Sequence, residues 1–66
     1  MKIKFNEHIK LATNDYNWGD EYFKVFEKDQ VIEILGVENN THGYKDIYFA
    51  HKEVAESVHQ SAFVIL

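Results

Sequence analysis

The chain lacks cysteine, proline and arginine. Without cysteine it has no disulfide and no thiolate zinc site, which excludes zinc fingers and the small secreted folds that disulfides hold together. Without arginine it has no guanidinium for bidentate contacts to guanine or phosphate. No apolar run approaches the roughly 18 residues of a membrane-spanning helix. These absences argue against membrane insertion and against most modes of nucleic-acid recognition.

The charge balance points the same way. Seven lysines face 11 carboxylates, which gives a net charge of −4, whereas proteins that bind a phosphate backbone are usually basic. We therefore expect no direct contact with nucleic acid. Residues 1–5 alternate charged and apolar side chains and lack the continuous apolar segment of a signal peptide, so we expect a cytoplasmic protein.

The length of 66 residues predicts a single domain spanning residues 1–66. A chain this short buries only about 60% of its unfolded surface, so its core is small. The 45% hydrophobic content with 15% aromatic residues is nevertheless typical of a folded globular domain. No internal repeat or linker divides the chain.

Apolar residues recur mainly with a period of two, which predicts half-buried strands and an all-β (mainly β) fold. Clusters of Asn, Asp and Gly predict the loops between them. The strands expected in the first 50 residues begin with 2–5 and 8–11, which are either two strands or one strand interrupted by a bulge or bend at 6–7. Strands 21–26, 31–37 and 44–50 follow, with loops at 13–20 and 38–43. Within 44–50, Ile47 and Phe49 are expected on one face, with Tyr44, Asp46 and Tyr48 on the other.

The last 16 residues allow two interpretations. Val54, Val58 and Ala62 are spaced four apart, as in a helix. The alternative, which we favour, is a hairpin with its tip at 52–53, a strand over 54–58, one helical turn, and a closing strand over 62–66. Ser57 and Gln60 have the spacing of a capping box and are expected to begin that turn.

Five or six short strands, a long first loop, a tight hairpin and a single turn before the last strand resemble the Src-homology-3-like barrel. The closest resemblance is to the small barrel proteins of bacteriophages and prophages, and it covers about residues 9–66. It implies a small barrel fold. In the peptide groove of that family, Tyr44 would stand for the tryptophan that opens the third strand. His59 and Ala62 stand where the groove has a proline and a tyrosine, so the resemblance does not imply recognition of proline-rich peptides.

No combination of residues predicts catalysis, a cofactor or a metal site. The four histidines, His8, His42, His51 and His59, have no local pair at ligand spacing. Ser57, Ser61, His59 and Asp46 supply the residue types of a hydrolase but no motif that would bring them together. We expect a protein that is not an enzyme.

The long first loop is the strongest candidate for function, because tyrosine and tryptophan dominate binding hot spots. We predict a protein-binding module, a phage or prophage accessory protein that binds and modulates a host protein through an aromatic and acidic surface. An alternative role for Trp18 is to cap one end of the barrel. The predicted binding residues are Tyr16, Trp18, Asp15, Asp20, Glu21, Tyr44 and Tyr48.

Two other functions remain open. The first is a small-molecule binder, such as a homo-oligomer that sequesters nucleotides in pockets between subunits. The second is a structural domain whose sheet edge pairs with another chain, which an open hydrophobic edge at residues 3–5 or 63–66 would favour. The sequence does not choose between a monomer and a homodimer.

Overall fold

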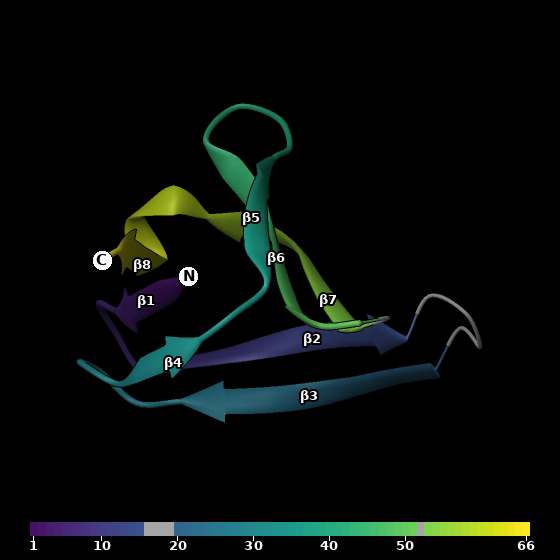
Figure 1. Cartoon of the computed structure of the whole chain (residues 1–66), viewed down its shortest axis with the longest axis horizontal. Helices are drawn as coiled ribbons and strands as arrows, with labels where there is room; N and C mark the ends of the chain where they lie inside the picture. The colour runs from purple at the N-terminus through teal and green to yellow at the C-terminus, as the bar shows by residue number, and fades with distance from the viewer. Residues whose placement is uncertain (16–19, 52) are drawn as a thin grey trace.

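A computed structural model describes residues 1–15, 20–51 and 53–66, with the backbone alone at 15, 20 and 21. The fold is all-β, as predicted, and the described strands form two antiparallel sheets (Figure 1). Its elements are β1 (Lys2–Phe5), β2 (Ile9–Asp15), β3 (Asp20–Phe26), β4 (Val31–Glu33), β5 (Gly36–Asn39), β6 (Tyr44–Ala50), β7 (Glu53–His59), a 3-10 turn η1 (Gln60–Ala62) and β8 (Phe63–Ile65).

The smaller sheet has three strands in the order β4-β1-β8. Ile3 of β1 lies opposite Ile32 of β4 on one side and Ile65 of β8 on the other. Its neighbour Lys4 lies between Val31 and Val64 in the same way. The alternation predicted for residues 2–5 is therefore confirmed, and β1 turns Ile3 and Phe5 into the core.

The larger sheet has five strands in the order β3-β2-β7-β6-β5. The β2-β3 hairpin runs along one side of the molecule, and the turn between β5 and β6 lies on the opposite side (Figure 1). Strand β7 is central, because it pairs with β6 along most of its length and with the last two residues of β2. This pairing places the end of the β2-β3 hairpin beside the tip of the β6-β7 hairpin.

Residues 31–37 do not form the single strand that their composition predicts. The chain bends at Ile34 and Leu35, so that β4 belongs to the small sheet and β5 to the large one. The cause is visible in two consecutive hydrogen bonds. The amide of Ile34 donates to the carbonyl of Met1, and the amide of Leu35 donates to the carbonyl of Tyr48 in the other sheet.

The core lies between the two sheets. The ring of Phe5 in the small sheet stacks on that of Phe26 in the large sheet, with centroids 4.5 Å apart, and Phe26 stacks in turn on Phe49 at 5.8 Å. Ile47 is fully buried and Phe49 packs against the core, as the predicted faces of 44–50 require. The buried core residues are Ile3, Phe5, Leu11, Phe26, Ile34, Ile47, Ala55, Val58, Ala62 and Phe63.

The predicted loop at 13–20 is too long. Thr13–Asp15 continue β2, and Asp20 already belongs to β3. Pairing with Val54 and Glu53 of β7 overrides the turn preference of Asn14 and Asp15, since strand propensity depends strongly on such neighbours. Thr13 is fully buried, and its hydroxyl donates to the carbonyl of Tyr22 at 3.0 Å.

The last third is the hairpin, single turn and closing strand that we favoured over a helix. The predicted cap is wrong, however. His59 caps the turn by accepting a hydrogen bond from the amide of Ser61 at its Nδ1. Ser57 stays in β7 with a φ of 57°, and its amide donates to Asp46 Oδ1 instead.

The strands of residues 1–15, 20–51 and 53–66 number eight rather than the predicted five or six. The difference arises from the bend at residues 34–35 and from the separation of β1 and β2 into different sheets. The two ladders remain separate in the described residues, and the predicted closed barrel is not found.

Candidate functional site

The residues that flank the predicted binding loop lie at one end of the large sheet. Tyr16 and Trp18 lie outside the described residues. Asp15 pairs with Asp20, and Glu21 pairs with Asn14, so these three acidic positions follow one another around the end of the β2-β3 hairpin. Asp15 also pairs with Glu53 at the start of β7.

Tyr44 lies at the opposite end of that sheet. It pairs with His59 at the end of β7, six residues from the Glu53 position beside Asp15. At about 3.3 Å per residue, the two ends of β7 are roughly 20 Å apart. The structure therefore does not bring Tyr44 close to the acidic positions of the hairpin. Its ring instead packs edge-on against the His59 ring, with centroids 5.0 Å apart.

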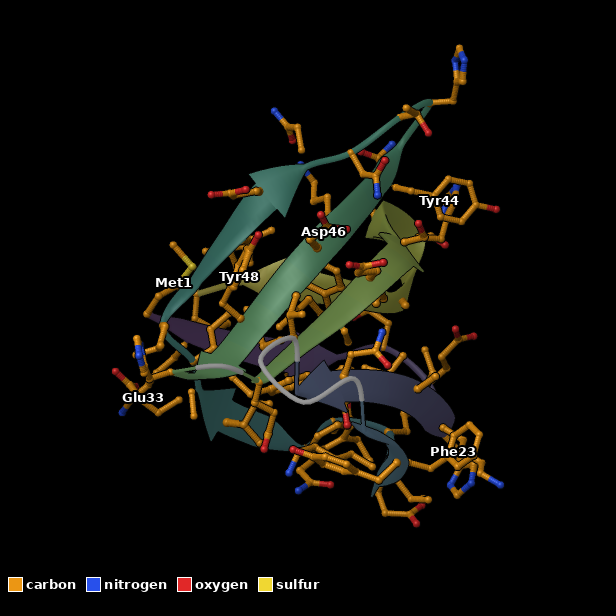
Figure 2. All side chains as sticks on the ribbon, turned by 90° about the vertical axis from the view of Figure 1, so that its right-hand side faces the viewer. Met1, Phe23, Glu33, Tyr44, Asp46 and Tyr48 are labelled. Carbon is orange, nitrogen blue, oxygen red and sulfur yellow. The ribbon has the colours of Figure 1, made fainter. Side chains whose placement is uncertain are left out.

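Tyr48 lies toward the other end of β6, as Figure 2 shows. It pairs with Val54 of β7, which pairs with Asn14 of β2, which pairs with Glu21 of β3. Tyr48 and the backbone position of Glu21 therefore share one row across four strands, a span of about 14 Å at 4.8 Å per strand. Of the two predicted binding tyrosines that the structure describes, Tyr48 lies at the same end of the sheet as the acidic positions.

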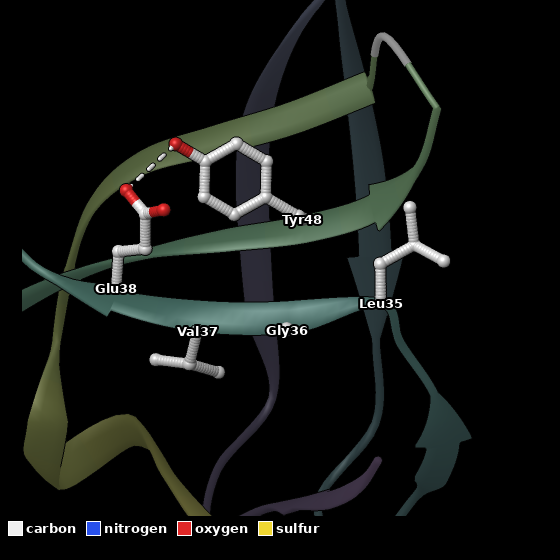
Figure 3. A pocket seen from close by; sticks show the side chains of 5 residues that line it. All are labelled: Leu35, Gly36, Val37, Glu38 and Tyr48. Atoms are coloured by element: carbon white, nitrogen blue, oxygen red, sulfur yellow. Dashed lines mark hydrogen bonds between the residues drawn. The ribbon is translucent and has the colours of Figure 1, made fainter.

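Carboxylates surround Tyr48 on the exposed face of β5, β6 and β7. Its hydroxyl donates to Glu38 Oε2 at 3.2 Å (Figure 3). Its pKa is raised above the usual value of 10.0, first by this hydrogen bond, then by desolvation, and then by the negative charges of Glu38, Asp46 and Glu56. These four residues, Glu38, Asp46, Tyr48 and Glu56, are called the acidic face below.

An open hollow of about 340 Å³ adjoins the acidic face (Figure 3). Leu35 and Val37 supply apolar walls, and Leu35 is 64% exposed. Glu38 and Tyr48 supply the polar side, and Gly36 adds no side chain. Because β5 is an edge strand, the hollow lies beside backbone groups that have no partner strand among the described residues.

A polar network holds the middle of the acidic face. Asp46 Oδ1 accepts from Asn40 Nδ2 at 2.9 Å and from the Ser57 amide at 3.1 Å. Asn40 Nδ2 also lies 3.1 Å from Ser57 Oγ. The register of β6 and β7 shifts between Lys45 and Ile47, next to this network. The network therefore links β6 to β7 at the point where their register shifts.

A second polar cluster joins β3 to β7. Tyr22 Oη donates to Glu53 Oε2 at 2.6 Å, and Lys24 Nζ lies 3.0 Å from Glu53 Oε1. The pKa of Glu53 is lowered mainly by the Tyr22 hydrogen bond and further by Lys24, against the opposing effect of burial. Lys24 Nζ also lies over the Phe49 ring at 5.9 Å. This cluster therefore links β3 and β7 across the strand that separates them, β2.

The residue types that suggested hydrolysis have other roles in the structure. His59 Nδ1 lies 2.7 Å from Ser61 Oγ, but the same nitrogen accepts the Ser61 amide, so this contact belongs to the cap of η1. Asp46 and Ser57 belong to the network at the bulge. All four histidines are exposed, and among the described residues no three His, Asp or Glu side chains are grouped to hold a metal ion.

Of the two open sheet edges considered from the sequence, one is paired on both sides in the structure and the other is open among the described strands. Residues 3–5 are not an edge, because β1 pairs on both sides. Residues 63–65 form β8, which has one neighbour among the described strands, and Val64, Ile65 and Leu66 are exposed. One of the two candidate edges is therefore open and apolar.

Comparison of the chain with protein-family models, with curated proteins and with solved structures finds no match. In the part of the chain that the structure describes, no helix is long and apolar enough to cross a membrane.

Sequence reasoning missed Leu35, Gly36 and Glu38 as site residues. Glu38 was assigned to a loop, although it extends β5 and pairs with Asp46. The signal that could have found them is the adjacent apolar pair Ile34-Leu35, which breaks the period of two and marks a strand that changes sheets.

Proposed function

We propose that this protein is a small, non-enzymatic protein-binding module, and that the acidic face with its hollow is the surface that receives the partner. The observation that carries the proposal is the position of Tyr48, half-buried beside the hollow and hydrogen-bonded to Glu38. Tyrosine next to an apolar recess is typical of binding hot spots, because its ring buries much area at little cost in conformational entropy.

The chemistry of the surface defines the kind of partner. Glu38, Asp46 and Glu56 favour a segment that carries lysine or arginine. Leu35, which is exposed beside the hollow, favours an apolar side chain within the same segment. An extended segment would also gain backbone hydrogen bonds from the free edge of β5, as in β-strand addition. The proposed partner is therefore a protein with an exposed, extended segment of basic and apolar residues.

The proposal extends to the fold family, the Src-homology-3-like barrel. Three features support it: the first strand pairs with the last, a bent strand passes from one sheet to the other, and a single 3-10 turn precedes the closing strand. The β2-β3 hairpin, in the place of the long first loop, pairs with β7. The size and acidic balance also suit a phage or prophage accessory protein that modulates a host protein, and the absence of cysteine suits the cytoplasm.

The test is affinity capture from a bacterial lysate with three baits. The first is the natural chain, and the second is Glu38→Gln/Tyr48→Ala, which removes one carboxylate and the central ring of the acidic face. The third is the matched control Glu7→Gln/Phe23→Ala, which removes one exposed carboxylate and one exposed ring elsewhere. Thermal melting of all three baits checks that each is folded.

We expect a protein that is retained by the natural chain and the control, is lost from the acidic-face variant, and dissociates as salt rises. Equal retention by all three baits would contradict the proposal. A thermal shift with ATP or GTP that disappears in Glu38→Gln/Tyr48→Ala would instead support the alternative, a nucleotide-binding protein.

A further inference from the structure

The free edge of β8 carries no charge. The edge strands of the described residues are β3, β4, β5 and β8, and each of the first three contains at least one Asp, Glu or Lys. Charged residues on edge strands prevent unwanted pairing with other chains. Phe63–Ile65 contains none, and no proline or bulge interrupts it. Among the described edges, β8 is therefore the one at which pairing with an identical strand meets no charge repulsion.

Both faces of this edge expose apolar side chains. Val64 is 41% exposed and ends the outer row that runs from Val31 through Lys4. Ile65 is 52% exposed and ends the inner row that runs from Ile32 through Ile3. Ile3 is fully buried, so the inner row lies against the core, and Ile65 at the end of the row is its exposed member. A further strand beside β8 would bury Ile65 as well.

The hydrogen-bond pattern identifies the backbone groups that are free. The Leu66 amide donates to the Lys2 carbonyl, and the Asn6 amide donates to the Ala62 carbonyl. Since alternate residues of an antiparallel strand bond to the same neighbour, residues 62, 64 and 66 bond toward β1. Phe63 and Ile65 therefore direct their amides and carbonyls toward the open side.

We infer that β8 pairs antiparallel with β8 of a second copy, giving a symmetric homodimer with a continuous six-stranded sheet. Phe63 of each copy lies opposite Ile65 of the other, which satisfies both free amides and both free carbonyls on each strand. Val64 lies opposite Val64 of the second copy, on the two-fold axis. This edge is self-complementary, as a two-fold interface requires.

Charge favours a second copy as the occupant. β8 presents no charge that would select a charged peptide. In the dimer, the two Lys4 side chains are three strand spacings apart, about 14 Å, which exceeds the Debye length of about 8 Å at physiological salt. The carboxylates of the acidic face lie on the other sheet of each copy. Pairing through β8 therefore brings no like charges into contact.

Disulfide trapping tests this arrangement, because the chain has no cysteine of its own. In the dimer, the two residues at position 64 form a pair without hydrogen bonds, with Cα atoms about 4.5 Å apart, within the range that a disulfide bridges. Val64→Cys is expected to form a covalent dimer under mild oxidation. The matched control is Val31→Cys, at the other end of the same row, where the two cysteines of a dimer would be five strand spacings apart.

Light scattering tests for the same dimer by its molar mass, without a cross-link. The natural chain is expected at twice 7.8 kDa, which is about 15.6 kDa. Val64→Glu places two carboxylates face to face on the axis and is expected to give the monomer mass, while Val31→Glu keeps the dimer mass. Circular dichroism and thermal melting establish that both variants, altered only at exposed positions, are folded.

Three outcomes would overturn the inference. The first is a natural chain that keeps the monomer mass at all concentrations up to about millimolar. The second is equal cross-linking of Val64→Cys and Val31→Cys, which would indicate random collision. The third is a monomeric natural chain in which Val64→Glu abolishes capture of a different protein, because the edge would then bind a foreign strand.

Discussion

The three-stranded and five-stranded sheets differ most in where their charged side chains lie. The small sheet carries Lys2, Lys4 and Glu33, and its edge strand β8 is neutral. The large sheet concentrates carboxylates around Tyr48 on β5, β6 and β7. One small core thus supports two surfaces of different chemistry, an uncharged apolar edge on the small sheet and an acidic face on the large one.

The two surfaces also depend on the core to different degrees. β1, at the centre of the small sheet, is anchored by the fully buried side chains of Ile3 and Phe5. The acidic face is held mainly by polar contacts, such as those of Asp46 with Asn40 and the Ser57 amide. Substitutions in the core should therefore disrupt both surfaces together, whereas polar substitutions should affect only one.

The largest expected effect comes from the ring stack that joins the sheets. Phe5→Ala removes the ring that stacks on Phe26 and leaves a cavity, which should lower the free energy of unfolding by about 3–5 kcal/mol. In a chain of this size that loss should unfold much of the population. Urea denaturation followed by circular dichroism measures it. Phe23→Ala, at a ring that is 58% exposed, should cost less than about 1 kcal/mol, and an equal loss in both variants would contradict this account of the core.

The next effect distinguishes Gly36, at the start of β5, from Gly43, in the turn before β6. Gly43 has a φ of 84°, a backbone conformation that strains residues with a Cβ, so Gly43→Ala should destabilise the protein by about 1–2 kcal/mol. Gly36 has open space around its Cα, and Gly36→Ala should change stability by less than about 0.5 kcal/mol. Thermal melting of both variants checks the difference. If Gly36→Ala were as destabilising as Gly43→Ala, the positive φ at Gly43 would not be the cause of the lost stability.

A smaller, pH-dependent effect is expected at Glu53. Its pKa is lowered in the folded state, so it contributes stability above its unfolded value of about 4.5, and this contribution is lost as the pH falls through the folded value. Between neutral pH and about pH 3, the natural chain should therefore lose more stability than Glu53→Gln. Denaturation curves at several pH values measure this. Parallel pH profiles for the two proteins would rule out the Tyr22 and Lys24 contacts as the source.

The smallest effect is spectroscopic and sharpens the description of the acidic face. Glu38→Gln removes the first cause of the raised pKa of Tyr48, so that pKa should fall toward the ordinary value of 10.0. NMR titration with ¹³C-labelled tyrosine follows it. Glu7→Gln is the control and should leave the Tyr48 titration unchanged; a shift of equal size in the control would mean that total charge, and not the contact, sets the pKa.

The strands that were predicted correctly are those whose own sequence shows which of their faces is buried. The alternation in residues 2–5 and 44–50 predicts β1 and β6, because each has one buried face. The closing strand was predicted because the segment after Ser61 is apolar throughout and was expected to be buried, but the structure leaves Val64, Ile65 and Leu66 exposed. The bend at residues 34–35 and the extension of β2 to Asp15 were not predicted, because both depend on hydrogen bonds to segments distant in sequence.

The site was predicted only in part. Tyr48 was placed on the face opposite Ile47, and the structure shows Tyr48 half-buried while Ile47 is fully buried. Its grouping with Tyr44 was an inference from composition, and the length of β7 separates the two ends of the sheet. Glu38 and Leu35 were not predicted as site residues, because their position beside Tyr48 depends on the register of β5 against β6. Register depends on tertiary pairing, which local sequence does not specify.

Amide hydrogen exchange compares the two surfaces most directly. Phe63 and Ile65 direct their amides to the open side of β8, and Val37 and Asn39 do the same on β5, since the Asn40 amide bonds to Tyr44 of β6. In the homodimer, the amides of Phe63 and Ile65 should be protected, and more so as concentration rises, whereas those of Val37 and Asn39 should exchange rapidly. Rapid exchange at all four amides would contradict the account, because neither edge would then have a partner.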